Sequence, residues 1–163
     1  MINAKLIIKT GEYCNDEAIY NTINYTFRLK DSIELYYGIW PPTKENAITT
    51  FEELRTKYPA QTSSKQVQHF EISFNTIKDK NFIISFAEQI AFLFAPIYPV
   101  CFALHDDTDN YHVHFIVSTT SHLPNHPPFE DDLWKCYYTH LLTEFSFKHG
   151  ISLQEVYKNA RTI

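Results

Sequence analysis

Three histidines in the second half of the chain have the types and spacing that could do chemistry. His105 is followed by His112 and His114 within the segment His-Asp-Asp-Thr-Asp-Asn-Tyr-His-Val-His. Successive side chains of a strand point to opposite faces, so His112 and His114 should share one face. A tight turn before them would bring His105 opposite the pair. Three imidazoles that converge in this way leave open positions on a metal ion, as a Lewis-acid catalyst requires. The spacing therefore predicts that the three histidines bind one divalent cation.

The segment of sequence around these histidines contains acidic residues and no basic ones. The interval between Lys80 and Lys135 contains no Lys or Arg but holds several Asp and Glu residues. Such a segment favours a cation site over a phosphate cradle. Asp107 is a candidate to orient one of the imidazoles through its second ring nitrogen. Asp106 and Asp109 are more typical of turn formers and solvated charge.

Strands and helices alternate on both sides of the motif. Residues 67–74 show the clearest strand pattern, with apolar and polar side chains in strict alternation. Further strands are predicted at residues 4–9, 33–40, 99–105 and 111–119, and the last two form a hairpin around residues 106–110. Helices are predicted from residue 16, at 45–58, at 78–95 and at 131–149, where Gly150 ends the helix. This order predicts an α+β fold with a largely antiparallel central sheet and flanking helices.

Composition limits the class of protein. A chain of 163 residues fits one domain, and a formal net charge of −5 argues against a protein that coats duplex DNA. The longest apolar stretch is too short to cross a bilayer, and no signal peptide is visible, so a cytoplasmic location is expected. The cysteines are far apart and are expected to be reduced or buried thiols; they are Cys14, Cys101 and Cys136.

The pattern HxDxxxxHxH resembles the metal-binding motif of plasmid mobilisation and T-DNA-type relaxases. These MobA/VirD-like proteins belong to the HUH endonuclease superfamily. In this sequence His105, Asp107, His112 and His114 fill the pattern. Further segments follow in the family's order. Residues 24–28, Asn-Tyr-Thr-Phe-Arg, resemble the segment that holds the nucleophilic tyrosine. Residues 67–74 resemble the strand that ends in Ser-Phe, and the helix before residues 149–151 resembles one that ends in His-Gly.

This resemblance implies a function. A relaxase nicks one strand of DNA at a transfer origin and keeps the strand as a 5′-phosphotyrosine link for conjugative mobilisation. The resemblance implies Mg or Mn as the cofactor, although imidazole ligands would equally suit Zn. It also implies single-stranded DNA as the partner and allows accessory mobilisation proteins. Because relaxases commonly carry further domains, residues 1–163 would be one relaxase domain at the N-terminal end of a longer protein.

Tyr25 fills the family's tyrosine position and is the predicted nucleophile. On a helix, Ile19, Ile23 and Phe27 form one apolar stripe, and Tyr25 falls nearly opposite to it. Tyr20 falls on the flank of that stripe, where a tyrosine usually packs with its hydroxyl at the edge. Packing therefore favours Tyr25 as the tyrosine that is available for chemistry.

The remaining candidates are weaker. His69 and Glu71 lie on the polar face of their strand and could assist the attack of the tyrosine on the phosphate. Exposure of that face to solvent would equally explain why these two positions are polar. Four basic residues could contact DNA phosphates or could be ordinary solvated charges; they are Lys5, Lys9, Arg28 and Lys30.

Other metal-binding classes are alternatives to the relaxase interpretation. A histidine-triad nucleotide hydrolase would need another histidine where Ile116 stands. A cupin-like enzyme needs a glutamate and a third histidine later in the chain, and His122, His126 or His140 could supply that histidine. A degenerate, non-catalytic metal-binding or DNA-binding module in replication or regulation is the main alternative, and the negative net charge favours it.

Overall fold

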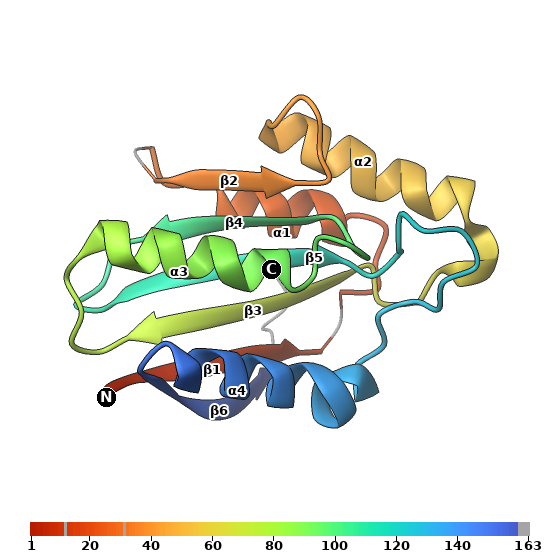
Figure 1. The fold of residues 1–163 in the computed structure, drawn as a ribbon. Coiled ribbons are helices and arrows are strands. Elements are labelled where there is room, and N and C mark those ends of the chain that lie inside the picture. The colour runs from red at the N-terminus through yellow and green to blue at the C-terminus, as the bar shows by residue number, and fades with distance from the viewer. Residues whose placement is uncertain (12, 31, 160–163) are drawn as a thin grey trace.

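A computed structural model describes residues 1–11, 13–30 and 32–159. These residues form a six-stranded sheet with the strand order β2-β4-β5-β3-β1-β6, flanked by helices on both faces (Figure 1). The strands are β1 (Ile2–Thr10), β2 (Glu34–Tyr37), β3 (Val67–Phe74), β4 (Val100–His105), β5 (Tyr111–Ser118) and β6 (Ile151–Asn159). The α-helices are α1 (Ala18–Thr26), α2 (Lys44–Lys57), α3 (Lys80–Phe92) and α4 (Thr139–Lys148).

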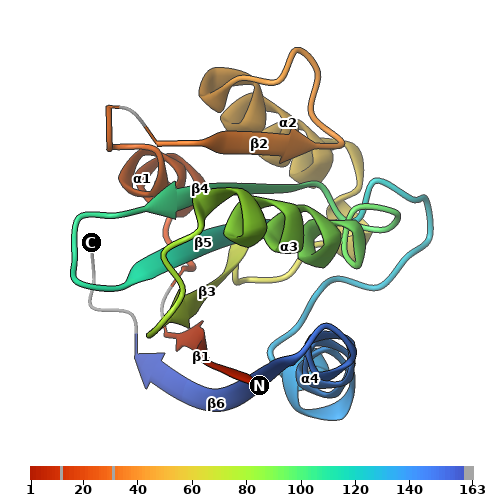
Figure 2. The same cartoon turned by 60° about the vertical axis from the view of Figure 1, so that its left-hand side comes forward.

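Helices α3 and α4 cover one face of the sheet, and α1 and α2 lie on the other (Figures 1 and 2). The main core fills the space under α3 and α4, because the apolar side chains of each central strand alternate onto that face. Phe70 of β3 and Phe115 of β5 stack there with their ring centres 4.6 Å apart. Trp134 packs edge-on against Phe70 and donates its indole hydrogen to Gln68. This core keeps the central strands rigid and in register.

The opposite face of the sheet is divided into two parts. Under α1 and α2 it is apolar, with Ile19 and Ile23 of α1 and Phe51 of α2 packed against Ile116 and Ala103 of the sheet. Beyond α1 the same face carries histidines, carboxylates and lysines instead. The end of α1 therefore lies at the boundary between a packed core and a polar surface.

Most sequence predictions of the fold are confirmed. The α+β class, the largely antiparallel sheet and the β4–β5 hairpin are present, and β3 has the predicted bounds. The strand predicted at 33–40 is shorter, because Gly38 adopts a positive φ of 74° directly after β2. In place of one helix over 131–149, a π-helical turn at Trp134–Tyr138 precedes α4. Strand β6 was not predicted, and it pairs parallel to β1.

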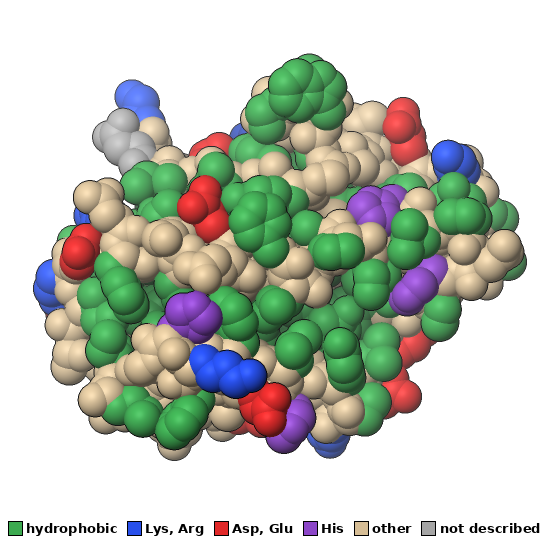
Figure 3. All heavy atoms as spheres, in the orientation of Figure 1, with side chains coloured by type: hydrophobic (Ala, Val, Ile, Leu, Met, Phe, Trp, Pro, Cys, Tyr) green, Lys and Arg blue, Asp and Glu red, His purple; other side chains and the backbone are tan. Residues whose placement is uncertain are grey.

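The surface over α3 and α4 shows scattered basic residues and no basic patch (Figure 3). In the described part of the chain, no helix combines the length and apolar character needed to cross a membrane. Cys14, Cys101 and Cys136 are free, as expected, and Cys101 is buried.

Candidate active site

Strand register brings the predicted histidines together on the polar part of the sheet. His105 of β4 lies directly opposite His112 of β5, and His114 lies opposite Glu71 of β3. Paired residues point to the same face, so all four side chains project toward the end of α1. Ligand-capable atoms of His105, His112 and His114 lie within 4.8 Å of one another. The three imidazoles therefore converge as the spacing predicted.

His105 is fixed by the end of helix α1. The last carbonyls of a helix have no partner within it, and His105 Nε2 donates a hydrogen bond to one of them, Thr26 O, at 2.6 Å. A carbonyl can only accept, so the hydrogen of this imidazole is on Nε2 and its lone pair is on Nδ1. Burial lowers the pKa of His105 and so favours the neutral form that a metal needs.

His112 is fixed in the same way by the hairpin turn. Its Nδ1 lies 3.1 Å from the carbonyl oxygen of Asn110, to which it donates. Nε2 is therefore the His112 nitrogen that could bind a cation. Asp107 approaches this same nitrogen, with Oδ1 at 3.7 Å. The hydrogen-bond partner of His112 Nδ1 is therefore Asn110, whereas Asp107 faces Nε2.

His114 shows most clearly that the site fits a cation. Its Nε2 is buried and has no hydrogen-bond partner among the described residues. An unpaired polar atom inside a protein costs about 1–3 kcal/mol, and a metal ion would satisfy it. Burial, and then the neighbouring imidazoles, lower the pKa of His114 well below its ordinary value, so this histidine is neutral. His105, His112 and His114 each offer an imidazole nitrogen toward the others, and such a donor set suits a divalent cation.

A second group of possible ligands, His69, Glu71 and His114, has a different character. The Tyr13 hydroxyl lies 2.9 Å from His69 Nδ1, and His69 Nε2 lies 2.9 Å from His114 Nδ1. Lys9 pairs with Glu71 at 2.7 Å. The polar atoms of this second group are therefore already occupied within the protein, and we do not assign a cation to it.

Tyr25 lies at the edge of the three-histidine cluster. Its ring is half-buried and meets the His114 ring edge-on, with ring centres 6.0 Å apart. The buried face of α1 includes Thr22 and Thr26 beside the apolar stripe, and this places Tyr25 on the flank of the helix. Tyr20 is 56% exposed, so the prediction that it would pack on the flank was wrong. Because Thr22 and Thr26 are buried as well, the buried face of α1 is rotated about the helix axis relative to the face that the apolar stripe alone predicts.

Arg28 joins Tyr25 to the hairpin. Its guanidinium lies over the Tyr25 ring at 4.1 Å from the ring centre and pairs with Asp107 at 2.9 Å. One Nη also donates to Tyr25 O at 2.9 Å and approaches His105 Nδ1 at 3.5 Å. The guanidinium thus lies between the tyrosine and the lone pair of the first histidine.

The other basic candidates are placed unequally. Lys5 is exposed and belongs to a row of paired residues, with Ser73 and His112, that crosses the sheet on the site's face. Lys9 is on the same face but is paired with Glu71. Lys30 is exposed beyond the end of α1. Lys5 and Lys30 therefore keep their charges exposed to solvent, whereas Lys9 already carries an ionic partner.

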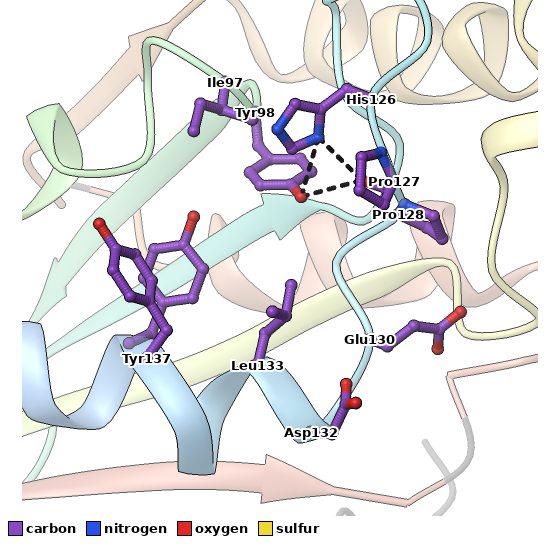
Figure 4. A pocket seen from close by; sticks show the side chains of 10 residues that line it. Ile97, Tyr98, His126, Pro127, Pro128, Glu130, Asp132, Leu133 and Tyr137 are labelled. Carbon is purple, nitrogen blue, oxygen red and sulfur yellow. Dashed lines mark hydrogen bonds between the residues drawn. The ribbon is translucent and has the colours of Figure 1, made fainter.

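A pocket of about 420 Å³ lies apart from these residues, on the α3 and α4 side of the sheet (Figure 4). Its lining includes Tyr98, Leu133 and Tyr138 together with the carboxylates Glu130 and Asp132. Carboxylates repel phosphate, so this pocket is unsuited to DNA, and the chemistry-bearing residues remain those around His114.

Sequence reasoning missed two contributors to the site. They are Tyr13 and Thr26, neither of which is identified as a site residue from the sequence. Neither carries a local signal, because Tyr13 reaches His69 only through the fold and Thr26 acts through its carbonyl.

A family model described as "Relaxase: MobA/VirD2-like, nuclease domain" matches residues 19–126. This range contains the part of α1 after Ala18, the central strands β3, β4 and β5, and all three clustered histidines. No curated protein and no solved structure matches the chain.

Proposed function

The chain belongs to the MobA/VirD2-like relaxase family, a family of DNA-nicking nuclease domains, and we propose that it nicks a transfer origin through a tyrosine. The product would be a 5′-phosphotyrosine link that carries one strand during conjugative mobilisation. Members of this family act on single-stranded DNA with a metal ion. We also propose which residues act as nucleophile, cation ligands and DNA contacts.

The observation that carries the proposal is the position of Tyr25 beside the three histidines. Tyr25 is the tyrosine that the resemblance selects, and its ring contacts His114 edge-on at 6.0 Å. Proximity of a nucleophile to a cation site is what phosphoryl transfer requires, because positioning and charge stabilisation supply most of the catalysis. Tyr20, about one and a half turns earlier, is 56% exposed, and within the described ranges its ring stacks on no histidine.

In the proposed reaction the Tyr25 hydroxyl attacks the phosphorus of one phosphodiester. The Tyr25 hydroxyl gives up its proton as the Tyr25–phosphate bond forms, the bond to the 3′ oxygen breaks, and that oxygen takes up a proton and leaves as a 3′-hydroxyl. His105, His112 and His114 would hold a divalent cation, Mg or Mn in this family, although three imidazoles also suit Zn. When bound, the cation would polarise the phosphate and neutralise charge that develops on its oxygens.

The other site residues have positioning roles in this proposal. Arg28 stacks on Tyr25 and orients its ring, and Asp107 holds Arg28 in place. Neither His69 nor Glu71 makes a hydrogen bond with the Tyr25 hydroxyl among the described residues, so we do not assign either as the base. Lys5 and Lys30 are the proposed contacts for DNA phosphates, and accessory mobilisation proteins remain candidate partners.

A nicking assay tests the proposed function. A single-stranded DNA library of random sequence, labelled at the 3′ end, is incubated with the protein and Mn, and the products are separated under denaturing conditions. We expect labelled protein with Mn and none with excess chelator, because the 3′ fragment stays on the tyrosine. His112→Ala should abolish the labelled product, and His140→Ala, which alters an exposed histidine on α4, should retain it. Metal binding or DNA binding without any labelled or cleaved product would support the non-catalytic alternative instead.

A further inference from the structure

A chain of buried polar side chains leads away from the metal-binding face of His114. It runs from His114 Nδ1 to His69 Nε2 at 2.9 Å, and from His69 Nδ1 to the Tyr13 hydroxyl at 2.9 Å. His114, His69 and Tyr13 are all buried, with exposed fractions of 2%, 2% and 5%. Buried polar groups in such a chain must match donor to acceptor at every step.

The direction of the hydrogen bonds follows from Glu71. Its Oε1 lies 3.3 Å from His114 Nδ1 and is paired with Lys9 at 2.7 Å. A carboxylate that is ion-paired in this way only accepts, so the hydrogen of His114 belongs on Nδ1. His69 Nε2 must then accept from His114, and a neutral His69 carries its own hydrogen on Nδ1 and donates it to Tyr13. His69 is buried at 2% exposure and, in the described part of the chain, has no carboxylate among its hydrogen-bond partners, so the uncharged ring is the form that fits this chain of hydrogen bonds.

We propose that Tyr13 and His69 are positioning residues that hold His114 with its hydrogen on Nδ1, so that its Nε2 faces the cation as a lone pair. The inference rests on the proposed function, because it gives the buried and unpartnered Nε2 a purpose. If the order of donors were reversed, His69 would donate to His114 Nδ1, and the hydrogen would move to Nε2 and block the ligand position. Side chains behind a metal ligand typically change metal affinity by about 10–100-fold when they are removed.

Two measurements on the full chain test this inference. The first is a long-range ¹H–¹⁵N correlation spectrum of metal-free, ¹⁵N-histidine-labelled protein at neutral pH, with His114 assigned by the loss of its signals in His114→Gln. We expect the hydrogen of His114 to be on Nδ1 in the wild-type protein. A hydrogen on Nε2 would overturn the inference, whether or not the protein binds metal.

The second measurement is Mn affinity by electron paramagnetic resonance, without DNA. His69→Leu should bind Mn about 10–100-fold more weakly. His69→Gln should restore most of the affinity, because its amide oxygen can accept from His114 while its amide nitrogen donates to Tyr13. Tyr13→Phe should weaken binding in the same direction. Tyr98→Phe, which removes a buried hydroxyl bonded to Pro127 O on the other side of the sheet, should leave affinity unchanged.

These measurements distinguish a failure of the inference about Tyr13 and His69 from a failure of the proposed metal centre. Wild-type protein that binds no Mn would count against the proposed metal centre, and the spectrum would still decide the tautomer. Folded His69→Leu and Tyr13→Phe with wild-type affinity would overturn the inference and leave the metal centre intact. If His69→Leu does not fold, Tyr13→Phe and the wild-type spectrum decide the result.

Discussion

The guanidinium carbon of Arg28 lies 4.1 Å from the centre of the Tyr25 ring, and the same group pairs with Asp107 at 2.9 Å. Arg28 follows the end of α1, whereas Asp107 belongs to the hairpin between β4 and β5. The ion pair therefore ties the helix that carries the proposed nucleophile to the turn that joins the two histidine-bearing strands. It also places a fixed positive charge next to the proposed cation site.

Arg28→Ala should change two properties in opposite directions. Removal of a neighbouring positive charge should tighten Mn binding by a few-fold, on the order of 1 kcal/mol for a partly exposed group. Loss of the stacked guanidinium should slow formation of the covalent DNA adduct, by up to about 100-fold, because the tyrosine is less well positioned. Isothermal titration with Mn and a timed adduct assay measure the two effects.

Two matched variants define the origin of these effects. Arg28→Lys keeps the charge, so it should leave Mn affinity near the wild-type value and still impair the adduct. Lys30→Ala removes an exposed charge two residues away and should leave Mn affinity unchanged. An Arg28→Ala protein with wild-type values for both properties would show that the stacking has no part in the reaction.

Tyr25→Phe should lose the covalent adduct entirely, whereas Tyr20→Phe should keep it. Both substitutions remove one hydroxyl and leave the ring, so the comparison isolates the nucleophile. Mass spectrometry of the digested adduct should locate the nucleotide on the peptide that contains residue 25. An adduct that persists in Tyr25→Phe and disappears in Tyr20→Phe would reverse the assignment.

The sequence predicts those parts of the site that depend on alternation within one strand or on one tight turn. The alternation in β5 places His112 and His114 on one face, and the short turn before β5 brings His105 opposite His112. These relations involve neighbours along the chain or across one tight turn. The bounds of β3 follow from the same kind of alternation.

The unpredicted features depend on contacts between distant segments. Strand β6 pairs in parallel with β1, about 149 positions earlier in the chain, and nothing in residues 151–159 indicates that partner. His69 was expected on a polar face that solvent could explain, but it is 2% exposed because Tyr13 and His114 pack against it. The orientation of α1 depends on Thr22 and Thr26, which are buried although an apolar stripe predicts otherwise.

DNA binding should depend on salt through a small set of lysines. Lys5 is exposed on the face of the site and Lys30 is exposed beyond the end of α1, so Lys5→Ala with Lys30→Ala should flatten the dependence of affinity on salt. For single-stranded DNA, each lysine that no longer neutralises a phosphate should lower the slope of log K against log salt by about 0.7. Lys57→Ala, on the last turn of α2, is the matched control and should keep the wild-type slope. An unchanged slope in the double variant would mean that other residues bind the phosphates.

Acid should destabilise the metal-free protein through His69. Burial lowers its pKa from 6.5 to about 3. Between these values the unfolded chain binds a proton that the folded chain does not, so the free energy of unfolding falls as pH decreases. The loss should approach about 1.4 kcal/mol per pH unit for this group within that window and vanish above it.

His69→Gln provides the comparison for this pH effect. Glutamine binds no proton, so the variant should show a pH slope that is shallower by about that amount between pH ~6 and ~4. Urea unfolding in the presence of chelator measures both proteins, and the lowered pKa values of His105 and His114 act in the same direction in each. Parallel slopes for the two proteins would mean that His69 titrates normally in the folded state.

The three-histidine centre is the central claim, and a crystal of the wild-type protein soaked in Mn tests it most directly. Anomalous diffraction at the manganese edge should show one peak in contact with His105 Nδ1, His112 Nε2 and His114 Nε2, the nitrogens that carry lone pairs in this structure. The guanidinium of Arg28 should withdraw from His105 to make room. A peak bounded by His69 and Glu71, or no peak among the three histidines at saturating Mn, would contradict the account.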